Sequence, residues 1–136
     1  MLKKIANKLS QYPGVYTFLR KIIENNFNSQ RKVIKEELKE PGKILDIACG
    51  IGEFSVYFDK DKKIGLDNEE KYINYAKKKF NRTFIIGDAL DLNFKKNSFD
   101  SILMSGFLHH LSDEDITKAI KEVHKVLKKG GKFLLI

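Results

Sequence analysis

The stretch from Ile44 to Phe54 constrains the fold of this chain more than any other. It begins with an apolar run broken only by an aspartate, which predicts a buried strand, and Gly50 and Gly52 follow in a turn that we expect to lead into a helix. Glycine tolerates unusual backbone conformations and lets the backbone approach a ligand closely. A strand, a glycine turn and a helix in this order predict a loop that binds a nucleotide-like ligand.

This loop matches only part of the glycine fingerprint of nicotinamide dinucleotide binding. The fingerprint needs a third small residue in register, usually glycine or alanine, and Ser55 occupies that position. Only Gly50 and Gly52 therefore match, which is two positions of the three. A nicotinamide-dependent oxidoreductase is therefore the weaker alternative for function. A plain strand-to-helix turn without a ligand is the other alternative for this loop.

Two further aspartates follow apolar runs. Asp67 ends the run that contains Ile64 and precedes a predicted helix from Asn68 to Phe80, in which Asn68 serves as the cap. A carboxylate at the end of a second strand can accept hydrogen bonds from both ribose hydroxyls, although Asp67 could also merely open the helix. Asp88 could accept from an exocyclic amine and the Ala89 backbone could serve a ring nitrogen, as adenine requires. The alternative for Asp88 is an ordinary turn residue.

With Asp46, Asp67 and Asp88 at three successive strand ends, the chain resembles the class I S-adenosylmethionine-dependent methyltransferases. The resemblance runs from about Ile44 to the last residue. The segment 99–105 looks like the fourth strand of that family, and 126–136 looks like its helix end, turn and fifth strand. The resemblance implies a methyltransferase with S-adenosylmethionine as its cofactor.

The resemblance also implies the site. Asp46 and the glycine loop would face the methionine portion, Asp67 the ribose, and Asp88 with Ala89 the adenine. Ala48 stands where many relatives carry glycine, and we expect the same backbone path there. The complete set of expected cofactor-binding residues is Asp46, Ala48, Cys49, Gly50, Gly52, Asp67, Asn68, Asp88, Ala89 and Ser105. Replacing Asp67 by alanine is expected to weaken cofactor binding with little loss of stability.

Hydrophobic periodicity supports the same architecture. Apolar residues at helical spacing predict a helix with one face on a sheet, begun by a capping box at Ser112 and Asp115 and ended at Gly130. The residues of that apolar face are Ile116, Ala119, Ile120, Val123 and Leu127. Strands alternating with helices predict an α/β doubly wound, Rossmann-like and mostly parallel sheet, which binds ligands beyond the carboxyl ends of its strands.

The first 42 residues differ from the rest. Apolar stripes at helical spacing predict a helical preface over 1–42, a cap or lid, before the cofactor-binding core at 43–136. Tyr12, Tyr16 and Phe18 are candidate ligand contacts, but packing is the favoured interpretation for these aromatics. A further helical stripe comprises Val33, Ile34 and Leu38.

Composition narrows the class. The chain has 136 residues, of which 42% are hydrophobic and 32% charged, as expected for one folded domain. No apolar run is long enough to span a membrane, and with no signal peptide we expect a cytoplasmic location. The net charge of +8 is almost entirely lysine, which favours a solvated surface over nucleic-acid binding. A single cysteine excludes an internal disulfide, and Cys49 is expected to pack within its loop.

Methyl transfer from a sulfonium needs positioning more than acid or metal catalysis. A base helps when the acceptor must lose a proton, and His109 and His110 are the candidates, of which at most one should face the pocket. We expect no metal, because no third ligand accompanies them. The expected acceptor is a small or lipid-like molecule, and an RNA, other nucleic-acid or protein methyltransferase is a lesser alternative.

The apolar segment 133–136 suits a strand that is covered on both faces. We therefore expect a chain truncated after its fifth strand, or a partner chain or homo-oligomer that covers the edge. A non-catalytic S-adenosylmethionine-binding module that acts with a partner is the alternative function.

Overall fold

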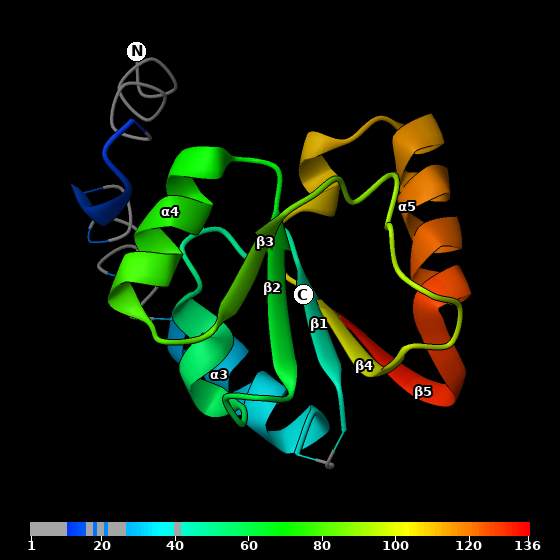
Figure 1. The fold of residues 1–136 in the computed structure, drawn as a ribbon. Helices are drawn as coiled ribbons and strands as arrows, with labels where there is room; N and C mark the ends of the chain where they lie inside the picture. Colours follow the sequence, from blue (N-terminus) through cyan, green and yellow to red (C-terminus); the bar gives the residue numbers. More distant parts are fainter. Residues whose placement is uncertain (1–10, 16–17, 19–20, 22–26, 40–41) are drawn as a thin grey trace.

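The computed structural model describes residues 11–15, 18, 21, 27–39 and 42–136 (Figure 1). A single five-stranded sheet with the order β3-β2-β1-β4-β5 organises them, and every neighbouring pair is parallel. The strands are β1 (Ile44–Ile47), β2 (Lys63–Asp67), β3 (Thr83–Ile86), β4 (Phe99–Met104) and β5 (Leu127–Leu135). This arrangement confirms the predicted α/β doubly wound fold.

Helices cover both faces of the sheet. Helices α3 (Asn28–Glu37) and α4 (Glu70–Lys79) lie on one face and α5 (Asp113–Val126) lies on the other (Figure 1). The buried apolar residues divide accordingly, because successive strand side chains point to opposite faces. Ile34 of α3 and its C-cap residue Leu38 pack with Ile44 and Leu103. Ile73 and Ala76 of α4 pack with Phe84. On the other face, Val123 and Val126 of α5 pack with Leu45 and Ile102.

Strand β1 is central, and its pairing brings three strand ends together. Ile47 is in register with Leu66 of β2 and Met104 of β4, so these strands end at one edge of the sheet. Asp67, one residue further along β2, is in register with Ile86 of β3. The loops that follow the strands therefore meet at the carboxyl edge.

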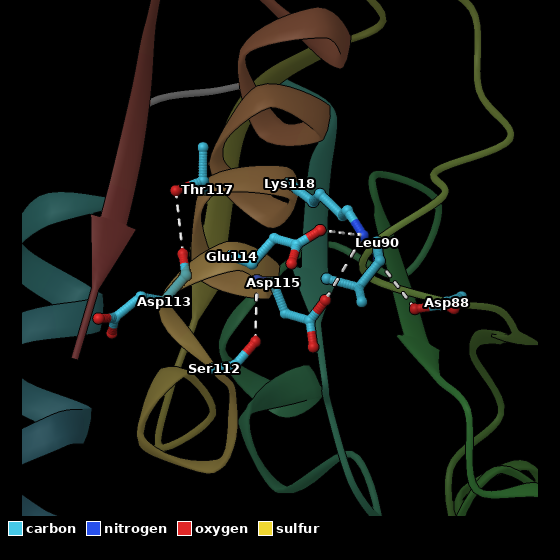
Figure 2. Close-up of polar contacts among 8 residues, drawn as sticks. All are labelled: Asp88, Leu90, Ser112, Asp113, Glu114, Asp115, Thr117 and Lys118. Atoms are coloured by element: carbon cyan, nitrogen blue, oxygen red, sulfur yellow. Dashed lines mark hydrogen bonds and ion pairs between the residues drawn. The ribbon is translucent and has the colours of Figure 1, made fainter.

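Helix α5 begins as the sequence predicts. Ser112 is the N-cap, and its Oγ accepts a hydrogen bond from the Asp115 N–H at 3.2 Å (Figure 2). Three acidic residues, Asp113, Glu114 and Asp115, occupy the first turn, where they interact favourably with the helix dipole. The cap explains why the helix starts at this residue.

The end of α5 differs from the prediction. The helix ends at Val126, and Leu127 already pairs with Phe99 in the sheet. Gly130, with φ 76°, lies at an irregular part of β5 and does not end the helix. Ile120 was expected on the buried face of the helix, but it is 38% exposed. The sheet overrides the local pattern because strand pairing satisfies backbone groups that a longer helix would leave facing β4.

Two other local predictions have different outcomes. The glycine turn leads into a helix as predicted, and this helix is a five-residue 3-10 helix, η2 (Glu53–Tyr57). Asn68 does not cap α4: the N-cap is Glu69, which makes no side-chain capping bond. Instead its backbone N–H is bound by the Asp67 carboxylate.

The helical preface is described only in part. Ile34 and Leu38 are buried, whereas Val33 is 38% exposed and does not join the core. Tyr12 and Phe18 are each 63% exposed, so the packing interpretation is wrong for these two aromatics. Tyr16 lies outside the described residues, and the lid function of the preface stays a prediction.

Strand β5 lies at the edge of the sheet. Phe133 and Leu134 are partly buried, whereas Leu135 is 47% exposed. The expectation that this strand is covered on both faces is therefore not met at Leu135.

Candidate functional site

The loop after β1 owes its path to residues in the left-handed region. Ala48, Gly50 and Gly52 have φ values of 56°, 55° and 77°. Within the loop, the Cys49 N–H donates to the Leu66 carbonyl at 3.0 Å. Ala48 thus adopts the backbone that glycine would take, at a cost of about 1–2 kcal/mol for the left-handed conformation of an L-residue.

The two loop glycines are needed for different reasons. A Cβ at Gly50 would meet nothing within 4 Å, so only the left-handed backbone conformation favours glycine at this position. A Cβ at Gly52 would lie 2.6 Å from the Phe84 ring, so packing against β3 also demands glycine there. Gly65 has the same constraint, with Phe84 at 2.6 Å and the Cys49 Sγ at 2.9 Å. Gly65 was not among the predicted site residues, although a glycine inside a strand is itself a signal of close approach.

Asp67 joins the loop to the start of α4. Its Oδ2 accepts the Gly50 N–H at 2.8 Å, and its Oδ1 accepts the Glu69 N–H at 2.9 Å. The residue is 8% exposed. Burial, followed by the charges of Glu69 and Asp46, raises the pKa of the Asp67 carboxyl above its usual value, and the two backbone hydrogen bonds oppose this effect without cancelling it. Asp67 is thus a desolvated carboxylate that holds two backbone segments in place.

Asp46 forms an ion pair that the sequence analysis did not anticipate. Its Oδ2 lies 2.7 Å from the Lys63 Nζ, and both side chains are only 2% exposed. The two residues come from neighbouring strands, β1 and β2. Lysines are rarely buried unless they are paired, and the partner of Lys63 lies on another strand. The residues next to Lys63 in the sequence therefore gave no sign that it is buried.

These residues border a cavity of about 410 Å³ at the carboxyl edge of the sheet. That volume lies in the range typical of small-molecule sites, about 300–1,000 Å³. The predicted site residues that line it are Asp46, Ala48, Cys49, Gly50, Asp67, Ser105 and His110. The lining residues that the sequence analysis missed are Phe27, Gln30, Ile51, Glu53, Phe54, Tyr72, Gly106 and Phe107. The cavity wall thus combines carboxylates with four aromatic rings.

The aromatic lining has a defined arrangement. Phe27, which precedes α3, and Phe54 of η2 meet edge to face, with ring centroids 5.9 Å apart. Phe107 follows β4 and leads into the short 3-10 helix η3 (Leu108–His110). These rings come from segments far apart in the chain, which explains why strand-end motifs alone did not identify them.

Five predicted site residues are not among those that line this cavity: Gly52, Asn68, Asp88, Ala89 and His109. Asp88 is exposed, and its Oδ1 accepts the Leu90 N–H at 2.8 Å, as a turn-forming aspartate does (Figure 2). Ala89 is 6% exposed and packs in the core. The centroids of the His109 and His110 rings lie 3.9 Å apart, and of the two only His110 borders the cavity.

The surroundings shift the pKa values of two further ionisable groups of the cavity. Burial, followed by the charges of Asp46 and Asp67, raises the pKa of the Cys49 thiol well above its usual value. The thiol therefore stays protonated and is a poor nucleophile. Burial also raises the pKa of Glu53, but contacts with Lys21 and Lys79 outweigh it and leave that pKa below its usual value.

Within the part of the chain that the structure describes, no group of three or more His, Cys, Asp or Glu side chains could hold a metal ion. None of the described helices is both long and apolar enough to cross a bilayer.

Comparison with known proteins gives a consistent result. The family model described as a methyltransferase domain matches residues 44–131. The chain is 33% identical to an uncharacterized methyltransferase of Synechocystis sp., over 93% of this chain and 63% of that protein. It is 30% identical to a demethylmenaquinone methyltransferase of Staphylococcus saprophyticus, over 95% of this chain and 60% of that protein.

A solved structure shares the fold. The S-adenosylmethionine-dependent methyltransferase of Methanosarcina mazei superimposes with a TM-score of 0.69 at 29% identity, over 76% of this chain and 55% of that chain. The present chain spans about three fifths of the length of the two curated relatives that it matches.

Proposed function

This chain belongs to the methyltransferase domain family, and on that premise we propose that it transfers the methyl group of S-adenosylmethionine to a small-molecule or lipid-like acceptor. The observation that carries the proposal is the cavity at the carboxyl edge of the sheet. There the glycine loop, Asp46 and Asp67 lie together, in the region where parallel α/β sheets bind their ligands.

The residues of the cavity fit the proposed cofactor. Each carboxylate oxygen can accept more than one hydrogen bond. Asp67 therefore keeps acceptor capacity for ribose hydroxyls while it binds the N–H groups of Gly50 and Glu69. The open space beside Gly50 leaves room for a ligand to approach the loop backbone. When bound, S-adenosylmethionine supplies a methyl group that its positively charged sulfur already activates.

The chain itself must orient the acceptor, exclude water and, for a hydroxyl or amine acceptor, remove a proton. Phe27, Phe54 and Phe107 supply apolar walls that exclude water from the cavity. His110 is the proposed general base, because it borders the same cavity and a neutral imidazole can take a proton near neutral pH. Its neighbour His109 does not line that cavity and offers a matched control.

The aromatic lining also supports the acceptor class. Flat or apolar acceptors gain favourable contact with such rings. A relative that is 30% identical is named demethylmenaquinone methyltransferase, which is consistent with a small-molecule acceptor for this chain too.

The proposal is tested in two measurements on the purified chain. Calorimetry should show binding of S-adenosylhomocysteine by the wild type. A transfer assay should then follow release of that product with a panel of quinol, amine, lipid, RNA and protein acceptors. His110→Ala should lower the transfer rate by about 100-fold or more with an unchanged dissociation constant for the product, whereas His109→Ala should change neither much.

Each outcome has a clear reading. Binding without transfer to any acceptor would favour the non-catalytic binding module. Binding of NAD with no response to S-adenosylhomocysteine would refute the proposal. Equal activity of the two histidine variants would remove His110 from the reaction while leaving the methyltransferase assignment in place.

A further inference from the structure

The buried ion pair between Asp46 and Lys63 lies directly against the candidate cofactor site. Asp46 lines the cavity, and its Oδ2 is 2.7 Å from the Lys63 Nζ. The Lys63 ammonium also lies 4.9 Å from the centre of the Phe58 ring. Both charged side chains are 2% exposed, so solvent cannot screen either of them effectively.

Lys63 is therefore the group that compensates the charge of Asp46. Neither the Asp46 Oδ2 nor the Lys63 Nζ has a regular hydrogen-bond partner among the described residues, although the two atoms are in ion-pair contact. Burial of a charge is strongly unfavourable unless a partner offsets it, and removal of one partner leaves the other uncompensated.

The other carboxylates that line the cavity differ in whether a lysine compensates their charge. Glu53 is paired with Lys21 at 2.9 Å and with Lys79 at 3.1 Å. Asp67 contacts two backbone N–H groups and forms no ion pair with a described residue. Among the carboxylates that line the cavity, Asp67 therefore has no described cation within ion-pair distance, whereas Asp46 and Glu53 are each paired with lysine.

We propose that Lys63 is a positioning residue of this site, which neutralises Asp46 and thereby sets the selectivity between the methyl donor, whose sulfur is cationic, and the product, whose thioether sulfur is uncharged. This inference rests on the proposed function. The donor carries a positive sulfur that becomes neutral when the methyl group leaves. A carboxylate without a cation would hold the donor more tightly than the product, because opposite charges attract strongly in a site of low polarity. Paired with Lys63, Asp46 contributes little to that difference.

The test measures dissociation constants of S-adenosylmethionine and S-adenosylhomocysteine by calorimetry at one pH near 8. The variants are Lys63→Met, Asp46→Asn and the double variant. Lys62→Met is the matched control, because Lys62 is the adjacent lysine but is exposed and paired with Asp59 at 2.9 Å. Thermal melts establish that each variant is folded.

Lys63→Met should raise the preference for the donor over the product at least tenfold, and Lys62→Met should leave it unchanged. Asp46→Asn should lower that preference, since the buried lysine is then the uncompensated charge. The double variant should return to within about threefold of the wild-type ratio, because neither charge remains. If Lys63→Met does not fold, the Asp46→Asn and double variants still decide the question.

Equal donor-to-product ratios in the wild type and all folded variants would overturn the role of Lys63 while leaving the proposed function intact. A wild-type chain that binds neither compound would refute the proposed function, and this inference with it.

Discussion

Replacement of Asp67 by alanine tests whether this carboxylate supports the fold as well as the ligand site. The variant loses the hydrogen bonds from the Gly50 N–H at 2.8 Å and from the Glu69 N–H at 2.9 Å. A hydrogen bond to a charged group contributes about 1.5–3 kcal/mol, so the two bonds together stabilise the protein by about 3–6 kcal/mol.

Burial of the carboxylate opposes this gain. The pKa of Asp67 is raised because burial, together with the charges of Glu69 and Asp46, outweighs the two backbone hydrogen bonds, so alanine also relieves an unfavourable desolvation. We therefore expect a net loss of about 2–3 kcal/mol in the free energy of unfolding, at or just below the lower limit of the hydrogen-bond contribution. That is a large part of the about 5–15 kcal/mol that stabilises a typical domain. The structure thus replaces the expectation from sequence that this variant would be nearly as stable as the wild type.

The assay is urea unfolding at pH 7 followed by circular dichroism, with calorimetry for S-adenosylhomocysteine. Asp88→Ala is the matched control, because Asp88 also follows a strand but is exposed and accepts one N–H, from Leu90. We expect the control to lose less than about 1 kcal/mol. If the Asp67 and Asp88 variants were equally stable, the argument from two buried backbone bonds would be refuted.

Three other predictions concern the glycine loop, the cap of α5 and the ionisation of Asp67. Gly50→Ala should cost about 1–2 kcal/mol of stability through its left-handed backbone, and Gly52→Ala should cost more because its Cβ would also lie 2.6 Å from Phe84; the reverse order in urea unfolding would contradict this reasoning. Ser112→Ala should lower the free energy of unfolding by about 1 kcal/mol through loss of the α5 cap, and Ser112→Asp should restore it. The pKa of Asp67 is raised in the folded state, so above about pH 4 the folded protein binds more protons at this residue than the unfolded chain does. The free energy of unfolding of the wild type relative to Asp67→Asn should therefore fall as pH rises from about 4 to 7. If urea titrations showed it to rise, the raised pKa would be rejected.

Much of the fold was predictable because its signals are local. An apolar run before Gly50 and Gly52 is nearly sufficient to specify a strand and a turn, and the serine at the start of α5 caps a helix wherever its backbone N–H groups need an acceptor. The end of α5 was not predictable in the same way. Gly130 resembles a helix stop, but pairing between Leu127 and Phe99 ends the helix earlier.

The candidate site shows the same division. The sequence by itself determined which residues follow the strands, and the parallel order then required Asp46, Asp67 and the glycine loop to meet at one edge. Only the tertiary structure decided that Lys63 is buried against Asp46 and that His110, not His109, borders the cavity. The physical reason is that local backbone preferences are properties of neighbouring residues, whereas burial and charge compensation depend on atoms that distant parts of the chain bring together.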